Sequence, residues 1–141
     1  MIVKQLSVFL ENKTGRLNEV ATLLGETEVN MSAFSLADNS DFGILRVIVS
    51  NIDKAQKILR ENNFATTITD VLCLRVSNQP GALANALNIL ADANIFIDYM
   101  YAFSQNDSAN VIIRVKNLKD AMDVLTKHQF ELVAADKLYE F

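Results

Sequence analysis

Hydrophobic residues follow two different periods in the first half of the chain. Residues 3–10 alternate apolar and polar side chains, which predicts a β-strand. Residues 15–26 repeat apolar side chains at helical spacing, which predicts an amphipathic helix. The helix face expected to point into the core carries Leu17, Val20, Ala21 and Leu24. The same reasoning predicts, in order, a strand at 29–37, a turn at 38–41, a strand at 42–49, a helix at 52–61 and a strand at 64–69.

The second half repeats the first with an offset of 66 residues, as between Gly15 and Gly81. Other identical pairs at this offset are Leu6 with Leu72, Asn12 with Asn78, Leu24 with Leu90, Leu59 with Leu125 and Phe64 with Phe130. An offset held over this length indicates two copies of one structural unit. The second copy predicts strands at 70–76, 95–103, 110–116 and 130–139, a turn at 104–107, a helix that begins near Pro80 and a helix at 118–127. The inner face of its first helix is expected to carry Leu83, Ala86, Leu87 and Leu90.

Each copy has the element order β-α-β-β-α-β of a ferredoxin-like unit, which is an α+β fold. Two helices are expected to cover one face of a four-stranded antiparallel sheet. The predicted domains are residues 1–69 and 70–141. Units of this size are marginally stable alone, so the two are expected to pack together.

Composition and charge narrow the function classes. The formal net charge is −4, whereas a nucleic-acid-binding protein needs a clustered basic surface. An RNA-recognition module of the same element order also needs aromatic residues among basic ones on its middle strands. The aromatic stripe of Tyr99, Tyr101 and Phe103 is interpreted instead as a sheet face or an interface. The apolar runs are too short for a transmembrane helix, and the N-terminus is interpreted as a strand, not a signal peptide, so no membrane contact is expected.

Side chains for catalysis or metal binding are scarce. The chain has one cysteine, Cys73, and one histidine, His128, so no Cys/His or Ser/His/Asp set can be assembled. Cys73 is expected to be a small buried hydrophobic residue in a reducing cytoplasm, and His128 a solvated residue at a helix end. The acidic residues lack metal-ligand spacing, and no phosphate-binding glycine motif occurs. We therefore expect no catalytic residue, no metal, no cofactor and no enzyme activity.

A polar loop before the first helix of each copy is the remaining candidate site. It reads NKTGRL at 12–17 and NQPGAL at 78–83. A loop that leaves a strand and opens a helix presents backbone N–H groups and the positive end of the helix dipole, which favour a carboxylate. The glycine of each loop permits close approach to the backbone, and the asparagine supplies an amide. The alternative is that each asparagine only caps its helix.

The two loops resemble the ligand loop of the ACT domain family, in which a polar residue and a residue that is often Pro precede Gly-x-Leu. TEVNMSAFS at 27–35 resembles the second-strand segment of the family, and ANIFIDYMYAF at 93–103 is its counterpart in the second copy. The resemblance covers the entire chain as two consecutive domains.

This resemblance implies a regulatory protein. ACT domains bind small molecules, most often amino acids, and usually control a linked or partner enzyme. They commonly pair side by side, so that two antiparallel sheets join with the helices on one face. A ligand then lies between the strand-to-helix loop of one unit and the second strand of the other. Because both units lie in one chain here, the resemblance implies that the pair can form within the chain. The ligand-binding residues that this implies are Asn12, Lys13, Thr14, Gly15, Arg16, Leu17, Asn30, Met31, Ser32, Asn78, Gln79, Pro80, Gly81, Ala82, Leu83, Phe96, Ile97 and Asp98.

The two implied sites differ in their polar groups. The second-strand asparagine of the family falls on Asn30 in the first copy, whereas the second copy has Phe96 there. If the loops cross between copies, the loop at 78–83 meets Asn30 and has the fuller set of polar partners. The loop at 12–17 meets Phe96 and keeps only Asp98 for an amino group. A further set of residues either lines a side-chain pocket or packs in the core: Met31, Phe34, Phe96 and Tyr99.

The predicted function is therefore that of a tandem ACT protein that binds a free amino acid and reports its level. The report would go to a partner such as a metabolic enzyme, or act through assembly. Strand alternation places Phe9, Arg46, Arg75 and Arg114 on the sheet face away from the helices, and this mixed surface favours a homodimer. The alternatives are a ligand-free adaptor with the same fold and a small enzyme such as an acylphosphatase, of whose loop pattern only Arg16 is present.

Overall fold

A computed structural model of the protein describes residues 1–38 and 41–139. Contacts within the chain divide it into two compact units. The first unit comprises residues 4–69, and the second comprises residues 1–3 and 70–139. The contacts thus place the first three residues with the second unit, and the domain bounds expected from the repeat stay a prediction.

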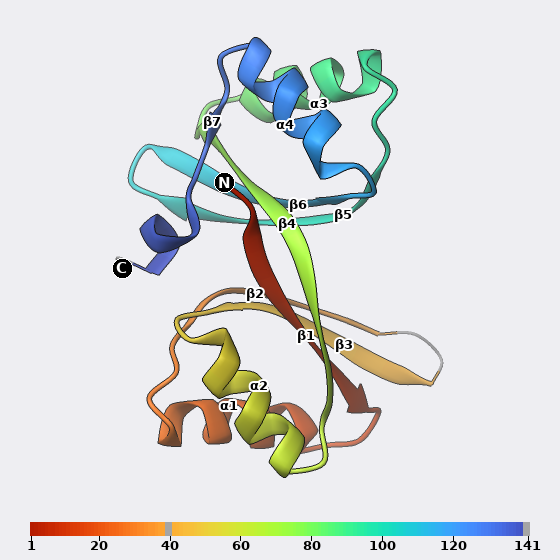
Figure 1. Ribbon diagram of the computed structural model, residues 1–141, viewed down its shortest axis with the longest axis vertical. Helices are drawn as coiled ribbons and strands as arrows, with labels where there is room; N and C mark the ends of the chain where they lie inside the picture. Colours follow the sequence, from red (N-terminus) through yellow and green to blue (C-terminus); the bar gives the residue numbers. More distant parts are fainter. Residues whose placement is uncertain (39–40, 140–141) are drawn as a thin grey trace. The chain divides into compact units, whose positions relative to one another are not determined.

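Both units have the expected order of elements. The first is formed by β1 (Val3–Glu11), α1 (Arg16–Glu26), β2 (Met31–Asp38), β3 (Phe42–Val49), α2 (Ile52–Glu61) and the beginning of β4 (Ala65–Ser77). The second continues with the rest of β4, α3 (Ala82–Asp92), β5 (Ile97–Gln105), β6 (Ser108–Val115), α4 (Leu118–Lys127), β7 (Glu131–Leu132) and the short 3-10 helix η1 (Ala135–Tyr139). Two α-helices lie on one face of the sheet in each unit (Figure 1). The predicted α+β class with two ferredoxin-like units is confirmed.

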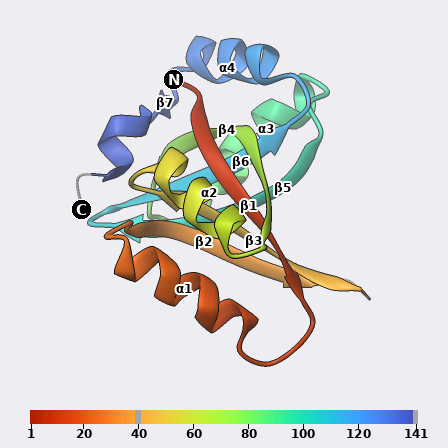
Figure 2. The same ribbon diagram turned by 60° about the horizontal axis from the view of Figure 1, so that its bottom comes forward.

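All the strand pairs with a described register are antiparallel. In the first unit the order is β2-β3-β1, followed by β4, and Figure 2 shows α2 in front of these strands. In the second unit β6 lies between β4 and β5, and β7 pairs with β4. Within the described residues, β2 pairs only with β3 and β5 only with β6, so the second strand of each copy is an edge strand.

Each unit has its own hydrophobic core between the helices and the sheet. In α2 the expected inner residues Ala55 and Leu59 are fully buried. In α1 the inner residues are Val20 and Leu24, whereas Leu17 is 38% exposed and Ala21 is also exposed. The expected inner face of α1 was therefore wrong at two positions. The helix begins only at Arg16, so Leu17 lies in its first turn, and the buried stripe runs through Leu23 instead.

The last strand is much shorter than expected. A strand was predicted at 130–139, but β7 has two residues and the chain then forms η1. The N–H of Val133 donates to the carbonyl oxygen of Cys73 at 2.8 Å, after which the chain leaves the sheet. The first copy does not end this way, because its last strand continues directly as β4. The turns were located correctly at Asn106–Asp107, while Asn39 and Ser40 of the turn predicted at 38–41 lie outside the described residues.

The sheet face away from the helices is largely buried. Gln5 and Ser7 on β1 are 0% and 6% exposed, and Cys73 and Ile112 are 0% exposed. Arg46, Arg75 and Arg114, which were expected on an open face, are half-buried. The prediction that this face is an open surface for a second chain is therefore wrong at these positions.

Cys73 is buried and forms no disulfide. Burial raises the pKa of its thiol to about 12, although the nearby Arg75 guanidinium partly opposes this shift. The thiol is consequently protonated at neutral pH and is a poor nucleophile. This agrees with the expected role as a small buried hydrophobic residue.

The raised pKa of Cys73 predicts alkaline destabilisation. In the unfolded chain the thiol ionises near its ordinary pKa of 9.0, whereas in the folded protein it stays protonated up to about pH 12. The stabilisation is therefore complete below pH 9 and is lost as the pH rises from 9 towards 12, at a rate of up to about 1.4 kcal/mol per pH unit. Urea unfolding at several pH values measures this loss. The Cys73→Ala variant should show a shallower decline, and equal declines in both proteins would contradict the assignment.

Candidate functional site

The glycine of each polar loop adopts a left-handed conformation immediately before a helix. Gly15 has φ 94° and ψ −11° before α1, and Gly81 has φ 87° and ψ −12° before α3. An L-residue with a side chain rarely adopts such angles, whereas glycine does so without steric cost. The glycines of the motif are thus required for the turn that starts each helix.

Neither of these helices has a side-chain cap within the described residues. The second helices of the two copies do have one. Asn51 Oδ1 accepts the N–H of Lys54 at the start of α2, and Asn117 Oδ1 accepts the N–H of Asp120 at the start of α4, both at 3.1 Å. In α1 and α3 the N-cap residue is a glycine, and Asn12 and Asn78 each lie three residues before it. The N–H groups of the first turn of α1 and α3 lack the side-chain acceptor that α2 and α4 possess.

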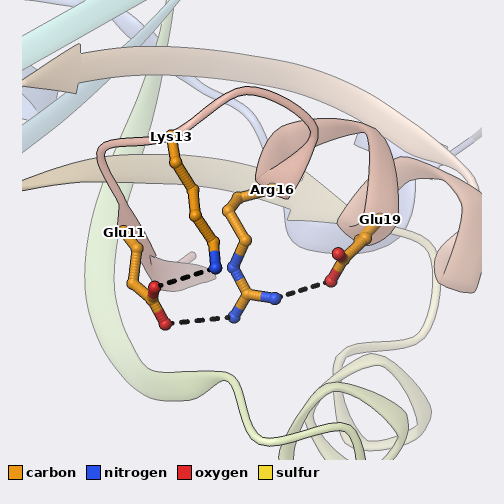
Figure 3. A network of polar contacts seen from close by, with 4 residues as sticks. All are labelled: Glu11, Lys13, Arg16 and Glu19. Carbon is orange, nitrogen blue, oxygen red and sulfur yellow. Dashed lines mark hydrogen bonds and ion pairs between the residues drawn. The ribbon is translucent and has the colours of Figure 1, made fainter.

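Charged side chains surround the first loop. Arg16 Nη1 lies 2.7 Å from Glu19 Oε2, Arg16 Nη2 lies 3.8 Å from Glu11 Oε1, and Lys13 Nζ lies 3.4 Å from Glu11 Oε2 (Figure 3). The Arg16 side chain is 17% exposed and its guanidinium lies 4.3 Å from the centre of the Phe64 ring. Its Nε is buried without a hydrogen-bond partner among the described residues. The cations of this loop are thus already paired with carboxylates of the same chain.

The second loop has no charged side chain of its own. The N–H of Asn78 donates to the carbonyl oxygen of Asp107 at 2.9 Å, which attaches the loop to the β5–β6 hairpin. The N–H of Ala82 donates to the carbonyl oxygen of Gln79 at 3.2 Å. From Asn78 to Gly81 the residues are exposed, and Ala82 and Leu83 are half-buried.

The first turns of the two helices also differ in charge. Glu19 lies in the first turn of α1, where it interacts with the positive end of the helix dipole, whereas the first turn of α3 has no acidic residue. A carboxylate ligand at α1 would compete with Glu19, and at α3 it would meet no such competitor. The unequal binding expected of the two loops stays a prediction.

The second strand of each copy begins with an irregularity. The register of β2 shifts between Met31 and Ala33, and that of β5 shifts between Ile97 and Tyr99. Ser32 and Asp98 fall at these shifts, and the hydroxyl oxygen of Ser32 is buried without a hydrogen-bond partner among the described residues. Such bulges are common next to functional sites, where they redirect a side chain.

The residues that precede these strands are exposed. Asn30 forms hydrogen bonds with Ser50 through its backbone, its N–H reaching Ser50 Oγ at 2.9 Å and its carbonyl oxygen accepting the Ser50 N–H at 3.0 Å. Phe96 is 78% exposed and lines a cavity of about 240 Å³ with Asn94, Lys116 and other residues.

The strand registers separate each loop from the second strand of its own copy. Glu11 at the end of β1 pairs with Phe42 at the start of β3, whereas Met31 pairs with Val49 at the other end of β3. In the second copy, Ser77 pairs with Ser108 and Ile97 with Val115, again at opposite ends. Neither loop therefore adjoins the start of the second strand of its own copy. The crossing of loops and strands between copies stays a prediction.

The residues expected to line a side-chain pocket do not gather within either unit. Met31 packs against the core of the first unit, and Tyr99 is half-buried in the second. Phe34 is 62% exposed, and with Leu36 at 53% it forms an apolar patch on the edge strand β2. Met100 on the edge strand β5 is 41% exposed. Strand alternation alone did not reveal these exposed edges, because it does not show which strand lies at the edge.

Metal-binding clusters and membrane-spanning helices are both absent from the described residues. No group of three or more His, Cys, Asp or Glu side chains in this part of the chain is arranged to hold a metal ion. No helix in the described ranges is long and apolar enough to cross a membrane.

Comparison with known proteins gives a family match over the whole chain. The family model of the ACT domain pair matches residues 1–141. The crystal structure of protein BT0572 from Bacteroides thetaiotaomicron is 50% identical, with a TM-score of 0.95, and the match covers 100% of this chain and 98% of that one. No curated protein matches the chain.

More distant structures share the fold. The ligand-free regulatory subunit of aspartate kinase from Thermus thermophilus is 12% identical with a TM-score of 0.66, covering 90% of this chain and 96% of that one. The regulatory subunit of aspartate kinase from Thermus flavus is 14% identical with a TM-score of 0.59, covering 90% and 94%.

The conformation of the loop glycines predicts opposite effects for matched substitutions. Gly15→Ala and Gly81→Ala should each destabilise the protein by about 1–2 kcal/mol, because alanine is strained at these φ values. Gly25→Ala, inside α1, should instead stabilise it by about 0.5–1 kcal/mol. A Cβ at any of the three would meet no atom within 4 Å, so the comparison isolates the backbone. Urea denaturation measures all three, and equal effects at Gly25 and Gly81 would contradict the explanation.

Proposed function

Since this chain belongs to the ACT domain pair family, we propose that it is a regulatory protein that binds a free amino acid and has no catalytic activity of its own. The observation that carries the proposal is the start of α3. There a left-handed glycine precedes a helix with no side-chain cap among the described residues and no acidic residue in its first turn. A helix N-terminus of this kind favours a carboxylate, which every free amino acid carries.

The proposed ligand position follows from the differences between the loops. The ligand carboxylate would lie at the N–H groups that follow Gly81, with the exposed Asn78 amide beside it. The loop at 12–17 would bind more weakly, because Glu19 and the paired cations already satisfy its charges. The other wall would come from the second strand of an adjoining ACT unit, with Asn30 and Ser32 as its polar residues and Met31 between them.

We propose that a second copy of the chain supplies the adjoining unit. The two edge strands carry the exposed apolar residues Phe34, Leu36 and Met100, and the exposed Phe96 directly precedes β5. An unpaired strand edge with an apolar patch is costly to leave in water and favours pairing with another strand. The homodimer would thus form through the edge strands, and not through the largely buried face that carries Arg46 and Arg75.

The proposed mechanism is thermodynamic linkage. An amino acid bound between the loop at 78–83 of one copy of the chain and the second strand of another would stabilise the dimer, and the dimer would in turn bind the amino acid more tightly. The output would pass to a partner, such as a metabolic enzyme in the cytoplasm. The regulatory subunits of aspartate kinase from two Thermus species share the fold, and a partner enzyme is proposed here by analogy with them.

A thermal-shift screen against the twenty amino acids tests the ligand. A ligand at a hundredfold excess over its dissociation constant should add about 2.7 kcal/mol of stability, which raises the melting temperature by several degrees. Asn78→Ala should abolish the shift, whereas Asn12→Ala should retain most of it. The absence of a shift with every amino acid would contradict the proposal and would favour a ligand-free adaptor.

Sedimentation velocity tests the dimer. Phe34→Glu and Leu36→Glu should convert the dimer into a monomer, because each would bring a carboxylate into the proposed contact. Ile68→Glu is a matched control, since Ile68 is also exposed, at 40%, but lies on β4 and not on β2 or β5, which form the proposed contact. A dimer that survives both edge substitutions would rule out the proposed interface.

A further inference from the structure

The exposed faces of α2 and α4 carry charges in the same pattern with opposite signs. On each helix, charged residues four positions apart form a ridge, since such residues lie one above the other on a helix. The ridge of α2 consists of Asp53, Lys57 and Glu61, and the ridge of α4 consists of Lys119, Asp123 and Lys127. All six residues are exposed. The first ridge is therefore negative, positive, negative, and the second is positive, negative, positive.

The direction of these ridges follows from the core contacts of the two helices. Ala55 and Leu59 of α2 are fully buried, and so is Leu125 of α4. Two residues turn an α-helix by about 200°, so the residue two positions beyond each buried one lies on the opposite side. Each helix packs on the sheet of its own unit (Figure 1), and its ridge therefore points away from the core of that unit.

The repeat shows that the exposed charges changed sign while the core stayed the same. At the offset of 66 residues, the positions that are charged in both helices are all inverted: Asp53 with Lys119, Lys54 with Asp120, Lys57 with Asp123, and Glu61 with Lys127. Arg60 is the remaining charged residue of α2, and its counterpart Thr126 is uncharged. The buried stripe is unchanged, as between Leu59 and Leu125. Packing within a unit does not require this inversion, because the inverted side chains lie outside the core.

The charged groups of both ridges are available to an outside partner. Within the described ranges, no hydrogen bond or ion pair uses the charged group of any of the six residues. The alternative is that neighbouring charges of one ridge pair only along their own helix, which is a weak interaction at an exposed surface. That alternative explains alternating signs on each helix but does not explain why the two helices alternate in opposite senses.

The signs select α4 as the partner of α2. When the two ridges pack antiparallel and in register, every charge lies opposite one of the other sign: Asp53 opposite Lys127, Lys57 opposite Asp123, and Glu61 opposite Lys119. The parallel arrangement also pairs opposite charges, because each pattern is symmetric about its central residue. Two α2 ridges would bring like charges together in either direction, and so would two α4 ridges. Attraction in this register is thus confined to the pairing of α2 with α4.

From this charge complementarity we propose that α2 of one chain binds α4 of a second copy of the same chain. The contact joins two different surfaces of identical chains, so every chain offers both halves of it. Exposed ion pairs are individually weak and are screened by salt, so the contact is reversible and forms best at low ionic strength. It uses neither the loop at 78–83 nor the edge strands, and it links the dimers proposed above into larger assemblies.

Carbodiimide cross-linking of a mixture of unlabelled and isotope-labelled wild-type chains tests the contact directly. This reagent joins a carboxylate to an amine that touches it, without a spacer. Mass spectrometry should recover peptides that join α2 to α4, such as Lys57 to Asp123, and these should combine a labelled with an unlabelled chain. The absence of such peptides would overturn the proposal, and so would their recovery from within single chains only.

Charge reversal at the centre of each ridge gives an independent test by sedimentation velocity at low salt. Lys57→Asp and Asp123→Lys should each weaken the salt-sensitive self-association about tenfold, because each replaces an attraction by a repulsion. A mixture of the two variants should regain the association, since opposite charges then meet again between the two kinds of chain. Asp92→Lys is the matched control, because Asp92 is exposed on α3 and its reversal changes the net charge as Asp123→Lys does. It should associate as the wild type does.

One further variant separates this contact from the edge strands. Phe34→Glu, which removes the proposed edge-strand contact, should leave the cross-links between α2 and α4 in place. Their loss in this variant would overturn the proposal of an independent contact. The proposal is also overturned if the mixture associates no better than the single variants, or if Asp92→Lys weakens association as much as Asp123→Lys. None of these outcomes bears on amino-acid binding, so the proposed regulatory function is tested separately.

Discussion

The left-handed backbone conformation of one glycine in each copy governs how the chain passes from strand to helix. Gly15 and Gly81 turn the chain sharply enough for the helix to return along the sheet, and they do so without a capping side chain. The second helices start differently, with asparagine caps at Asn51 and Asn117. The fold thus combines two ways of starting a helix. In one, an asparagine side chain accepts one N–H group of the first turn, and in the other the glycine at the N-cap offers no side-chain acceptor.

Hydrophobic periodicity predicted the bounds of an element well where the capping residue and the buried stripe indicate the same helix. The bounds of α2 and α4 matched, because each helix begins after a capping asparagine and buries a continuous stripe through residues such as Leu59 and Leu125. The prediction of the last strand was wrong, because hydrophobic alternation cannot show that the chain leaves the sheet at Val133. The burial of Gln5 and Ser7 was missed for a related reason, since polar residues were assigned to solvent although they are buried.

The candidate site was predictable as a loop but not as a pair of unequal loops. The repeated Asn-x-x-Gly-x-Leu pattern located both turns, and the offset between them located the second strands. The role of Glu19 was not foreseen, because its proximity to Arg16 depends on where α1 begins. The hydrogen bond between Arg75 and Asn110 was also overlooked. At the repeat offset, Arg75 occupies the position that Phe9 has in the first copy, so the change in polarity was already visible in the sequence. Repeats are thus most informative where the copies disagree in polarity at a buried position.

The continuous strand β4 has a consequence for how such a protein can arise and change. Its residues Ala65–Ser77 belong to both copies, and no loop separates the two at Asp70. A gene duplication that joined two copies in this way left no linker at which recombination could later separate them. Insertions at the junction would interrupt a paired strand, so the copies are expected to evolve as one inherited module. Their side chains can still diverge, and it is in the side chains that the two copies differ.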